Sequence, residues 1–291
     1  MRRWLLILGV VAALVAGFVL AMVVTALWRS GWSVALGDHI GVVEVRGFIA
    51  DPRPAVAALR DFRKDDSVKA VVLRVETPGG GIAPSQEIHD EVRRTAEAKP
   101  VVVSMGAVAA SGGYYISAPA TKIVANPGTA TGSIGVIIQF QEVHALFNKL
   151  GLRTQVVKSG PLKDAGSPFR EMTDEERAVF QSLIDDLFQQ FVDAVAEGRG
   201  MDREAVLALA DGRVYSGRQA LNLGLVDRLG GFWDAVEWAR ELGGLSGEPR
   251  LEYRRRERGG VLRWLLGEDA GALAPLESAG TPPLRYVVPG W

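Results

Sequence analysis

The sequence contains no cysteine and only three histidines, which stand far apart at His39, His89 and His144. The absence of cysteine excludes disulfide bonds, thiolate metal sites and a cysteine nucleophile. Three scattered histidines do not supply the closely spaced ligands of a histidine-rich metal centre. We therefore expect neither a metal ion nor another cofactor.

A strong net charge is also lacking. The 291 residues carry a formal net charge of −1, with 23% charged residues, so nothing favours a nucleic-acid partner. Lysine is scarce and does not occur after position 163. The few lysines late in the chain therefore stand out as candidates for a chemical role. They are Lys122, Lys149, Lys158 and Lys163.

Charge is absent altogether between Trp4 and Trp28. Crossing a bilayer takes about 20 apolar residues, whereas a cleavable signal peptide has an apolar region of only about 7–15, so we predict a retained anchor. Arg2 and Arg3 precede the run and Arg29 follows it. This weak excess of positive charge before the run favours a cytoplasmic N-terminus, with the rest of the chain translocated across the membrane. A buried helix of a soluble protein is the alternative.

Beyond a short linker, continuous apolar runs alternate with helical patterns, which predicts an α/β fold with a buried, mostly parallel sheet and flanking helices. Strands are expected at residues 40–45, 70–75, 100–105, 122–125, 134–138 and 154–157. Helices are expected at residues 54–62, 84–98, 141–150, 173–198, 202–210, 216–223 and 233–242. Thr173 and Glu176 have the spacing of a capping box at the start of the longest helix.

Ser111 lies where an apolar run gives way to small residues, between Ala110 and the pair Gly112 and Gly113. Small neighbours allow a sharp turn and the close approach of a substrate chain. A strand, a turn and a helix in succession would leave the Ser111 hydroxyl at a helix N-terminus, where negative charge is stabilised. The alternative is a serine that only caps the helix.

Three glycine-containing loops could accompany this serine. Residues 77–81 follow a strand, and their N–H groups could form an oxyanion hole, a phosphate cradle or a plain turn. Residues 128–135 could orient a catalytic group or simply turn the chain. Residues 158–168 carry two lysines, and a lysine serves as a base when its pKa falls from about 10.4 toward neutrality. Because Asp164 would oppose that fall, we expect it to point away from Lys163.

Two histidines compete with the lysines for the role of base. His144 is expected on the surface of an amphipathic helix over residues 141–150. His89 is expected on a solvated helix face, because acidic residues surround it in the sequence.

Read in order, these motifs resemble the bacterial signal peptide peptidase family, in its short form with one N-terminal anchor. The resemblance rests on residues 77–80, 109–115, 131–136, 158–160 with 163–164, 211–217 and 220–230. It implies a Ser-Lys protease on the fold shared by the Clp protease proteolytic subunit and the crotonases. The chain departs from the family at Glu76 and Thr77, where a serine commonly precedes Pro-Gly-Gly.

The resemblance also implies roles for individual residues. Ser111 would be the nucleophile and Lys163 the general base. Gly80 and Gly112 would supply the N–H groups of an oxyanion hole, and Ser133 could form a hydrogen bond with the lysine. The implied domains are an anchor over residues 1–30, a linker over 31–39, a protease domain over 40–246 and an extension over 247–291.

The implied function is that of a membrane-anchored endopeptidase that degrades remnant signal peptides and other membrane-associated peptides. Its subunits would form a homo-oligomeric ring, with the catalytic domain on the extracytoplasmic side of the cell membrane. The alternatives are an anchored protease for a stomatin-like membrane partner, a catalytically silent membrane scaffold and an acyl-CoA enzyme of the crotonase type. A further hypothesis places the segment from Arg285 to Trp291 in the active-site groove, like a product.

Overall fold

The computed structural model describes residues 14–18, 22, 37–254 and 284–287, and the chain divides into two units, Met1–Asp38 and His39–Trp291. In the first unit, residues 14–18 are helical. The described residues include no helix with the length and apolar composition needed to span a bilayer. Most of the run from Trp4 to Trp28 lies outside the described residues, so the anchor stays a prediction.

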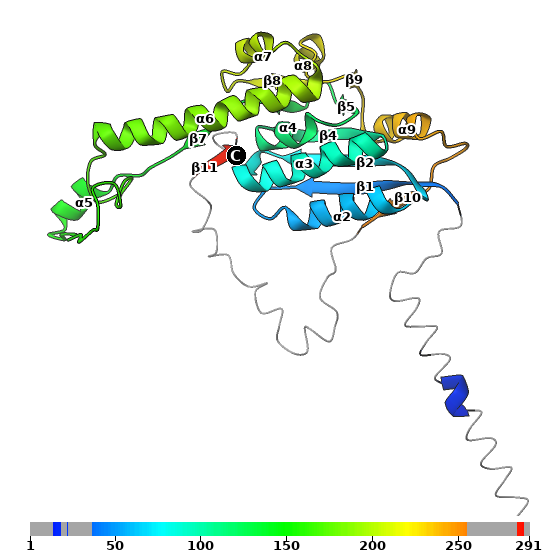
Figure 1. Ribbon diagram of the computed structural model, residues 1–291, viewed down its shortest axis with the longest axis horizontal. Coiled ribbons are helices and arrows are strands. Elements are labelled where there is room, and N and C mark those ends of the chain that lie inside the picture. Colours follow the sequence, from blue (N-terminus) through cyan, green and yellow to red (C-terminus); the bar gives the residue numbers. More distant parts are fainter. Residues whose placement is uncertain (1–13, 19–21, 23–36, 255–283, 288–291) are drawn as a thin grey trace, which may run out of the picture. The chain divides into compact units, whose positions relative to one another are not determined.

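The second unit is built on one sheet in which neighbouring strands are parallel except for the pair β6 and β8. Its main path runs in the order β10-β1-β2-β4-β5-β9, and β6 joins β4 to β8 (Figure 1). The strands are β1 (His39–Arg46), β2 (Val68–Thr77), β4 (Val101–Ala110), β5 (Lys122–Ala125), β6 (Ala130–Gly132), β8 (Val214–Ser216), β9 (Arg228–Leu229) and β10 (Leu251–Tyr253). The predicted mostly parallel α/β core is confirmed.

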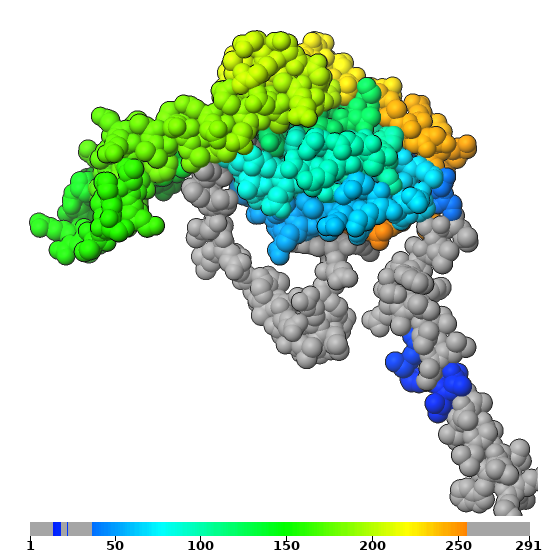
Figure 2. Space-filling view, viewed as in Figure 1, coloured from blue at the N-terminus to red at the C-terminus, as the bar shows by residue number. Residues whose placement is uncertain are grey.

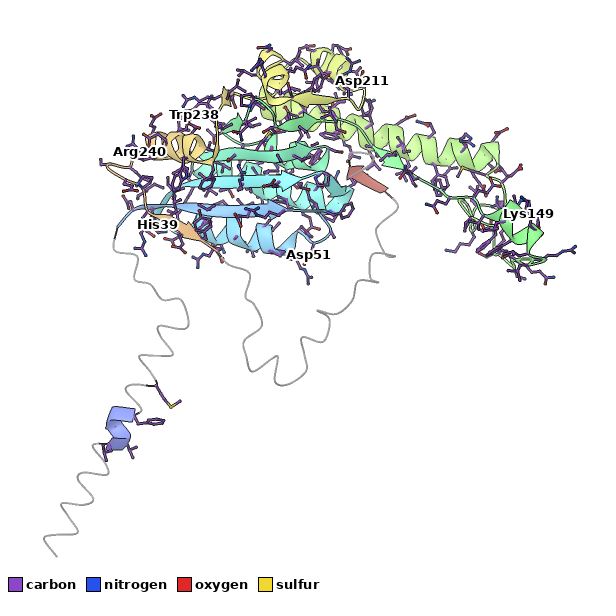
Figure 3. The ribbon with its side chains drawn as sticks, turned by 180° about the vertical axis from the view of Figure 1, so that it is seen from behind. His39, Asp51, Lys149, Asp211, Trp238 and Arg240 are labelled. Atoms are coloured by element: carbon purple, nitrogen blue, oxygen red, sulfur yellow. The ribbon has the colours of Figure 1, made fainter. Side chains whose placement is uncertain are left out.

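Helices cover both faces of this sheet because its central strands are apolar on both sides. Val71, Leu73 and Val75 of β2 face the larger core, whereas Val72 faces a smaller core under one helix. Trp238 and Arg240 mark that helix, α9 (Phe232–Leu242), in Figure 3. The other described helices of this domain are α2 (Arg53–Lys64), α3 (Ile82–Ala98), α4 (Gly112–Ser117), α5 (His144–Lys149), α6 (Asp174–Arg199), α7 (Arg203–Leu209) and α8 (Gly217–Asn222).

The capping box predicted at residue 173 is present. The Glu176 N–H donates to Thr173 Oγ1 at 3.2 Å, and the Thr173 N–H donates to Glu176 Oε2 at 3.0 Å. This reciprocal pair satisfies two N–H groups at the start of α6, which then runs for 26 residues.

Only the second half of α6 packs on the core. Phe191 and Val195 are buried, but Val179 and Leu183 are 46% and 40% exposed. The first half of α6, the short helix α5 (His144–Lys149) and the loop between them extend beyond the sheet, and we call residues 139–183 the arm (Figures 1 and 2).

Two strand predictions in the arm region need correction. Residues 154–157 form no strand, and Val157 is fully exposed, because no neighbouring strand offers them hydrogen-bond partners. Of the strand predicted over 134–138, only β7 (Ile137–Ile138) forms, whereas Ile134 is buried in the core.

Candidate active site

Ser111 is the single residue between β4 and α4, and its backbone has φ 53° and ψ −115°. A non-glycine residue with positive φ is strained by roughly 1–3 kcal/mol, and it persists only where its surroundings hold it. Here the Ser111 N–H donates to the Gly132 carbonyl at 2.8 Å, and the Ser111 carbonyl accepts from the Tyr115 N–H at 2.8 Å. Both main-chain groups are therefore fixed, and the side chain is presented in one direction.

The Ser111 hydroxyl is buried and has no hydrogen-bond partner among the described residues. Ser111 occupies the N-cap position of α4, as the alternative interpretation expects, but its hydroxyl makes no capping hydrogen bond to the helix. An unpaired buried hydroxyl costs about 1–3 kcal/mol and calls for a functional explanation. Strain and a missing partner together make Ser111 the strongest candidate nucleophile of the described chain.

Gly80 and Gly112 meet beside this serine. Gly80 lies in the short strand β3 (Gly79–Gly81), and the main chain of Ile49 is so close that a Cβ on Gly80 would lie 2.3 Å from the Ile49 carbonyl oxygen. A Cβ on Gly112 would lie 3.1 Å from the Gly80 nitrogen. Two main-chain segments without side chains therefore pack against each other at the Ser111 turn, and their N–H groups are the candidate donors of an oxyanion site.

Ser133 belongs to the same region. It is buried, it also has a positive φ of 50°, and its N–H donates to the Arg213 carbonyl at 2.9 Å. It directly follows Gly132, which holds Ser111. The structure thus brings together Ser111, Gly112, Gly80 and Ser133 from separate loops.

Lys163 is not joined to this group in the single chain. Its side chain is exposed on the loop of the arm, and the Ser111 hydroxyl has no partner among the described residues. Asp164 points away from Lys163, as predicted: it accepts from Lys158 Nζ at 2.5 Å and from Arg170 Nη2 at 2.8 Å. The hydrogen bonds from Arg170 and Lys158 hold the pKa of Asp164 well below its usual range.

Neither His89 nor His144 forms a hydrogen bond with the Ser111 hydroxyl. His89 is buried, not solvated as predicted, and its ring packs against Tyr115 with centroids 4.8 Å apart. This burial lowers the pKa of His89. His144 lies on α5, as expected, where its Nε2 is 2.9 Å from Asn148 Nδ2.

An extended segment that sequence patterns did not identify as a strand lies beside the site. Strand β11 (Leu284–Val287) is antiparallel to β3, with Tyr286 opposite Gly80 and Val287 opposite Gly79. Its other edge pairs with β7, and it also contacts α3 and α4 (Figure 1). This placement agrees with the hypothesis for Arg285–Trp291 as far as Val287; residues 288–291 lie outside the described part.

These features define an α/β protein in which a buried serine, without a hydrogen-bond partner in the described chain, lies beside glycine main chain and near a strand edge that pairs with an extended segment. The model of peptidase family S49 matches residues 93–246. The chain belongs to this family and is a peptidase, and the resemblance found in the sequence motifs is confirmed.

Individual relatives agree with this assignment. A protein of Synechocystis sp. named as a candidate protease is 45% identical over 208 residues, which cover 71% of this chain and 75% of the relative. A candidate signal peptide peptidase, SppA, of Enterococcus faecium is 42% identical over 71% of this chain and 60% of its own length. A chloroplastic serine protease, SPPA, of Arabidopsis thaliana is 33% identical over 74% of this chain and 32% of the relative.

Proposed function

We propose that this peptidase is a membrane-anchored serine endopeptidase with Ser111 as nucleophile and Lys163 as general base. The observation that carries the proposal is the Ser111 hydroxyl, which is buried, unpartnered within the described chain and held on a strained turn. An unpaired hydroxyl on a strained turn lowers the stability of the fold, and a structural role for Ser111 does not explain that cost. A nucleophile, by contrast, must be left free to interact with its base and its substrate.

The proposed mechanism is a two-step hydrolysis. Ser111 Oγ attacks the scissile carbonyl carbon while its proton passes to the neutral Lys163 amine, and the carbonyl oxygen takes the negative charge. The Gly80 and Gly112 N–H groups stabilise that oxyanion. The intermediate collapses, the C–N bond breaks, and the lysine returns the proton to the leaving amine. Water then hydrolyses the acyl-serine by the same proton route, with Ser133 orienting the amine.

We infer that the dyad is completed when subunits assemble into a ring. The arm leaves apolar side chains uncovered in the single chain, and exposed apolar surface of this kind marks an interaction site. They are Leu146, Leu150, Leu152, Val156, Val157, Leu162, Val179 and Leu183. Covering the arm would also take Lys163 out of water, and burial favours the neutral amine that a base requires.

We further propose that the substrates are remnant signal peptides and membrane-associated peptides, and that Trp4–Trp28 anchors the enzyme with its catalytic domain outside the cytoplasm. Strand β11 supports a peptide substrate, because it shows that the edge of β3 accepts an extended chain in antiparallel pairing.

The substrate class is tested with the full chain in detergent micelles. Synthetic signal peptides should be cleaved at several internal bonds, while a stomatin-like membrane protein should be cleaved no faster. Cleavage confined to that protein would replace this proposal by the partner-specific alternative.

Removal of β11 should raise activity. Deleting residues 284–291 is expected to increase kcat/KM for a short peptide by about 2–10-fold, chiefly through a lower KM, because a tethered competitor no longer occupies β3. The measurement is a peptide titration of the two proteins. A synthetic peptide of residues 284–291 should inhibit the truncated enzyme more strongly than a scrambled peptide. Unchanged activity after the deletion would count against occupation of the groove.

A further inference from the structure

The loop that carries Lys163 is tied to the start of α6 by one arginine. Arg170 Nε donates to Asp164 Oδ2 at 3.1 Å, and Arg170 Nη2 donates to Asp164 Oδ1 at 2.8 Å. The same guanidinium donates from Nη1 to Glu176 Oε2 at 2.9 Å and from Nη2 to Glu176 Oε1. We call Asp164, Arg170 and Glu176 the loop clamp.

Each end of the loop clamp is anchored. Asp164 directly follows Lys163, and its carboxylate also accepts from Lys158 Nζ on the other side of the loop. Glu176 is 2% exposed, and it is the same residue that closes the capping box with Thr173. A shift of Arg170 would therefore release the residue next to Lys163 from the rigid first turn of α6.

The charges of the loop clamp are stable around neutral pH. Hydrogen bonds from Arg170 lower the pKa of Glu176 to about 2, and those from Arg170 and Lys158 lower the pKa of Asp164 further below its usual range. Both carboxylates thus stay ionised until the solution is strongly acidic. The loop clamp therefore persists over any pH at which a neutral lysine could act.

We propose that Arg170 is a positioning residue: it fixes the Lys163 loop to α6 and, together with Lys158, holds the Asp164 carboxylate away from the Lys163 amine. The inference rests on the proposed function of Lys163 as general base. Arginine suits this task because its planar fork binds two carboxylates at once, whereas a lysine ammonium acts as a point charge.

The test compares Arg170→Lys with the wild-type full chain in peptide cleavage. Lysine keeps the positive charge but cannot span both carboxylates, so Lys163 loses its fixed position. We expect kcat to fall about 10–100-fold, since a misplacement of about 1 Å in catalytic geometry costs about 100-fold. KM and the size of the assembly on gel filtration should remain unchanged, and although weakening the contact with the buried Glu176 carboxylate is expected to lower Tm, the variant should stay folded at the assay temperature. Arg170→Ala should lower kcat at least as much.

The matched control is Arg203→Lys. Arg203 Nε donates to Asp193 Oδ1 at 2.6 Å, so it also joins a carboxylate of α6, but at the opposite end of that helix from the loop. Its kcat should equal that of the wild type. Wild-type kcat in Arg170→Lys, or a change in KM or Tm that accounts for the whole loss, would overturn the positioning role.

Failure of this inference is distinguishable from failure of the proposed function. If Lys163→Ala is inactive and Arg170→Lys retains wild-type kcat, only the positioning role is lost. If Lys163→Ala itself cleaves normally, the base is another group and the role of Arg170 falls with it.

Discussion

Replacing Ser111 by alanine is expected to abolish peptide cleavage, with kcat reduced by about 10⁴-fold or more. Loss of a catalytic nucleophile removes the covalent route, and what remains comes from substrate binding and oxyanion stabilisation alone. The measurement is cleavage of a fluorogenic peptide by the assembled protein. The same substitution should prevent labelling by a serine-reactive phosphonate, which would label the unmodified enzyme.

The stability of Ser111→Ala separates a nucleophile from a structural serine. The hydroxyl has no partner among the described residues, so its removal should leave Tm unchanged or raise it. Ser117 provides the matched control, because its buried hydroxyl donates to the Gly113 carbonyl at 2.7 Å. Ser117→Ala should lose about 1 kcal/mol of stability and keep its activity. Full activity of Ser111→Ala would show that another residue is the nucleophile, whereas an unmodified protein that neither cleaves peptides nor is labelled would favour the silent scaffold.

Replacing Lys163 by alanine should also abolish cleavage, by about 10³–10⁴-fold, while Tm and assembly size stay the same. The reason is that Ser111 would then lack a group to accept its proton, and the folded chain would lose only an exposed side chain. The assay is the same peptide cleavage, accompanied by gel filtration to show that the assembly survives.

Two variants serve as controls for Lys163. Lys149 lies on the same arm, is exposed and is labelled in Figure 3, so Lys149→Ala removes an equal charge without removing the proposed base. His144→Ala removes the competing base, whose ring nitrogen is next to Asn148. Both should retain activity. Robust cleavage by Lys163→Ala, with loss in His144→Ala, would replace the Ser-Lys dyad by a Ser-His pair.

Local sequence patterns predicted the central elements well. The continuous apolar runs identified β1, β2, β4 and β5, and the capping box placed the start of α6. Such patterns work because a strand buried on both faces and a capped helix are recognisable from neighbouring residues alone. The short strands β3, β6, β8, β9, β10 and β11 were not predicted, since such short segments carry little periodicity and their pairing depends on a distant partner.

The errors have a common physical cause. His89 was expected in solvent because its neighbours in sequence are acidic, but α3 turns it toward Tyr115 on α4. Val179 and Leu183 follow the same helical spacing as Phe191, yet they lie on the arm, where the described chain has no core to cover them. Periodicity shows that a face is apolar, but it does not show what packs against it.

The sequence by itself determined the family, the class of fold and the set of candidate site residues, because these depend on residue types in a fixed order. Only the tertiary structure decided which of these candidate residues lie close together. It placed Gly80, Gly112 and Ser133 around Ser111, because parallel strands end at one edge of the sheet. It left Lys163 exposed on the arm, and it laid β11 along β3, because pairing between distant segments depends on backbone geometry and not on local composition.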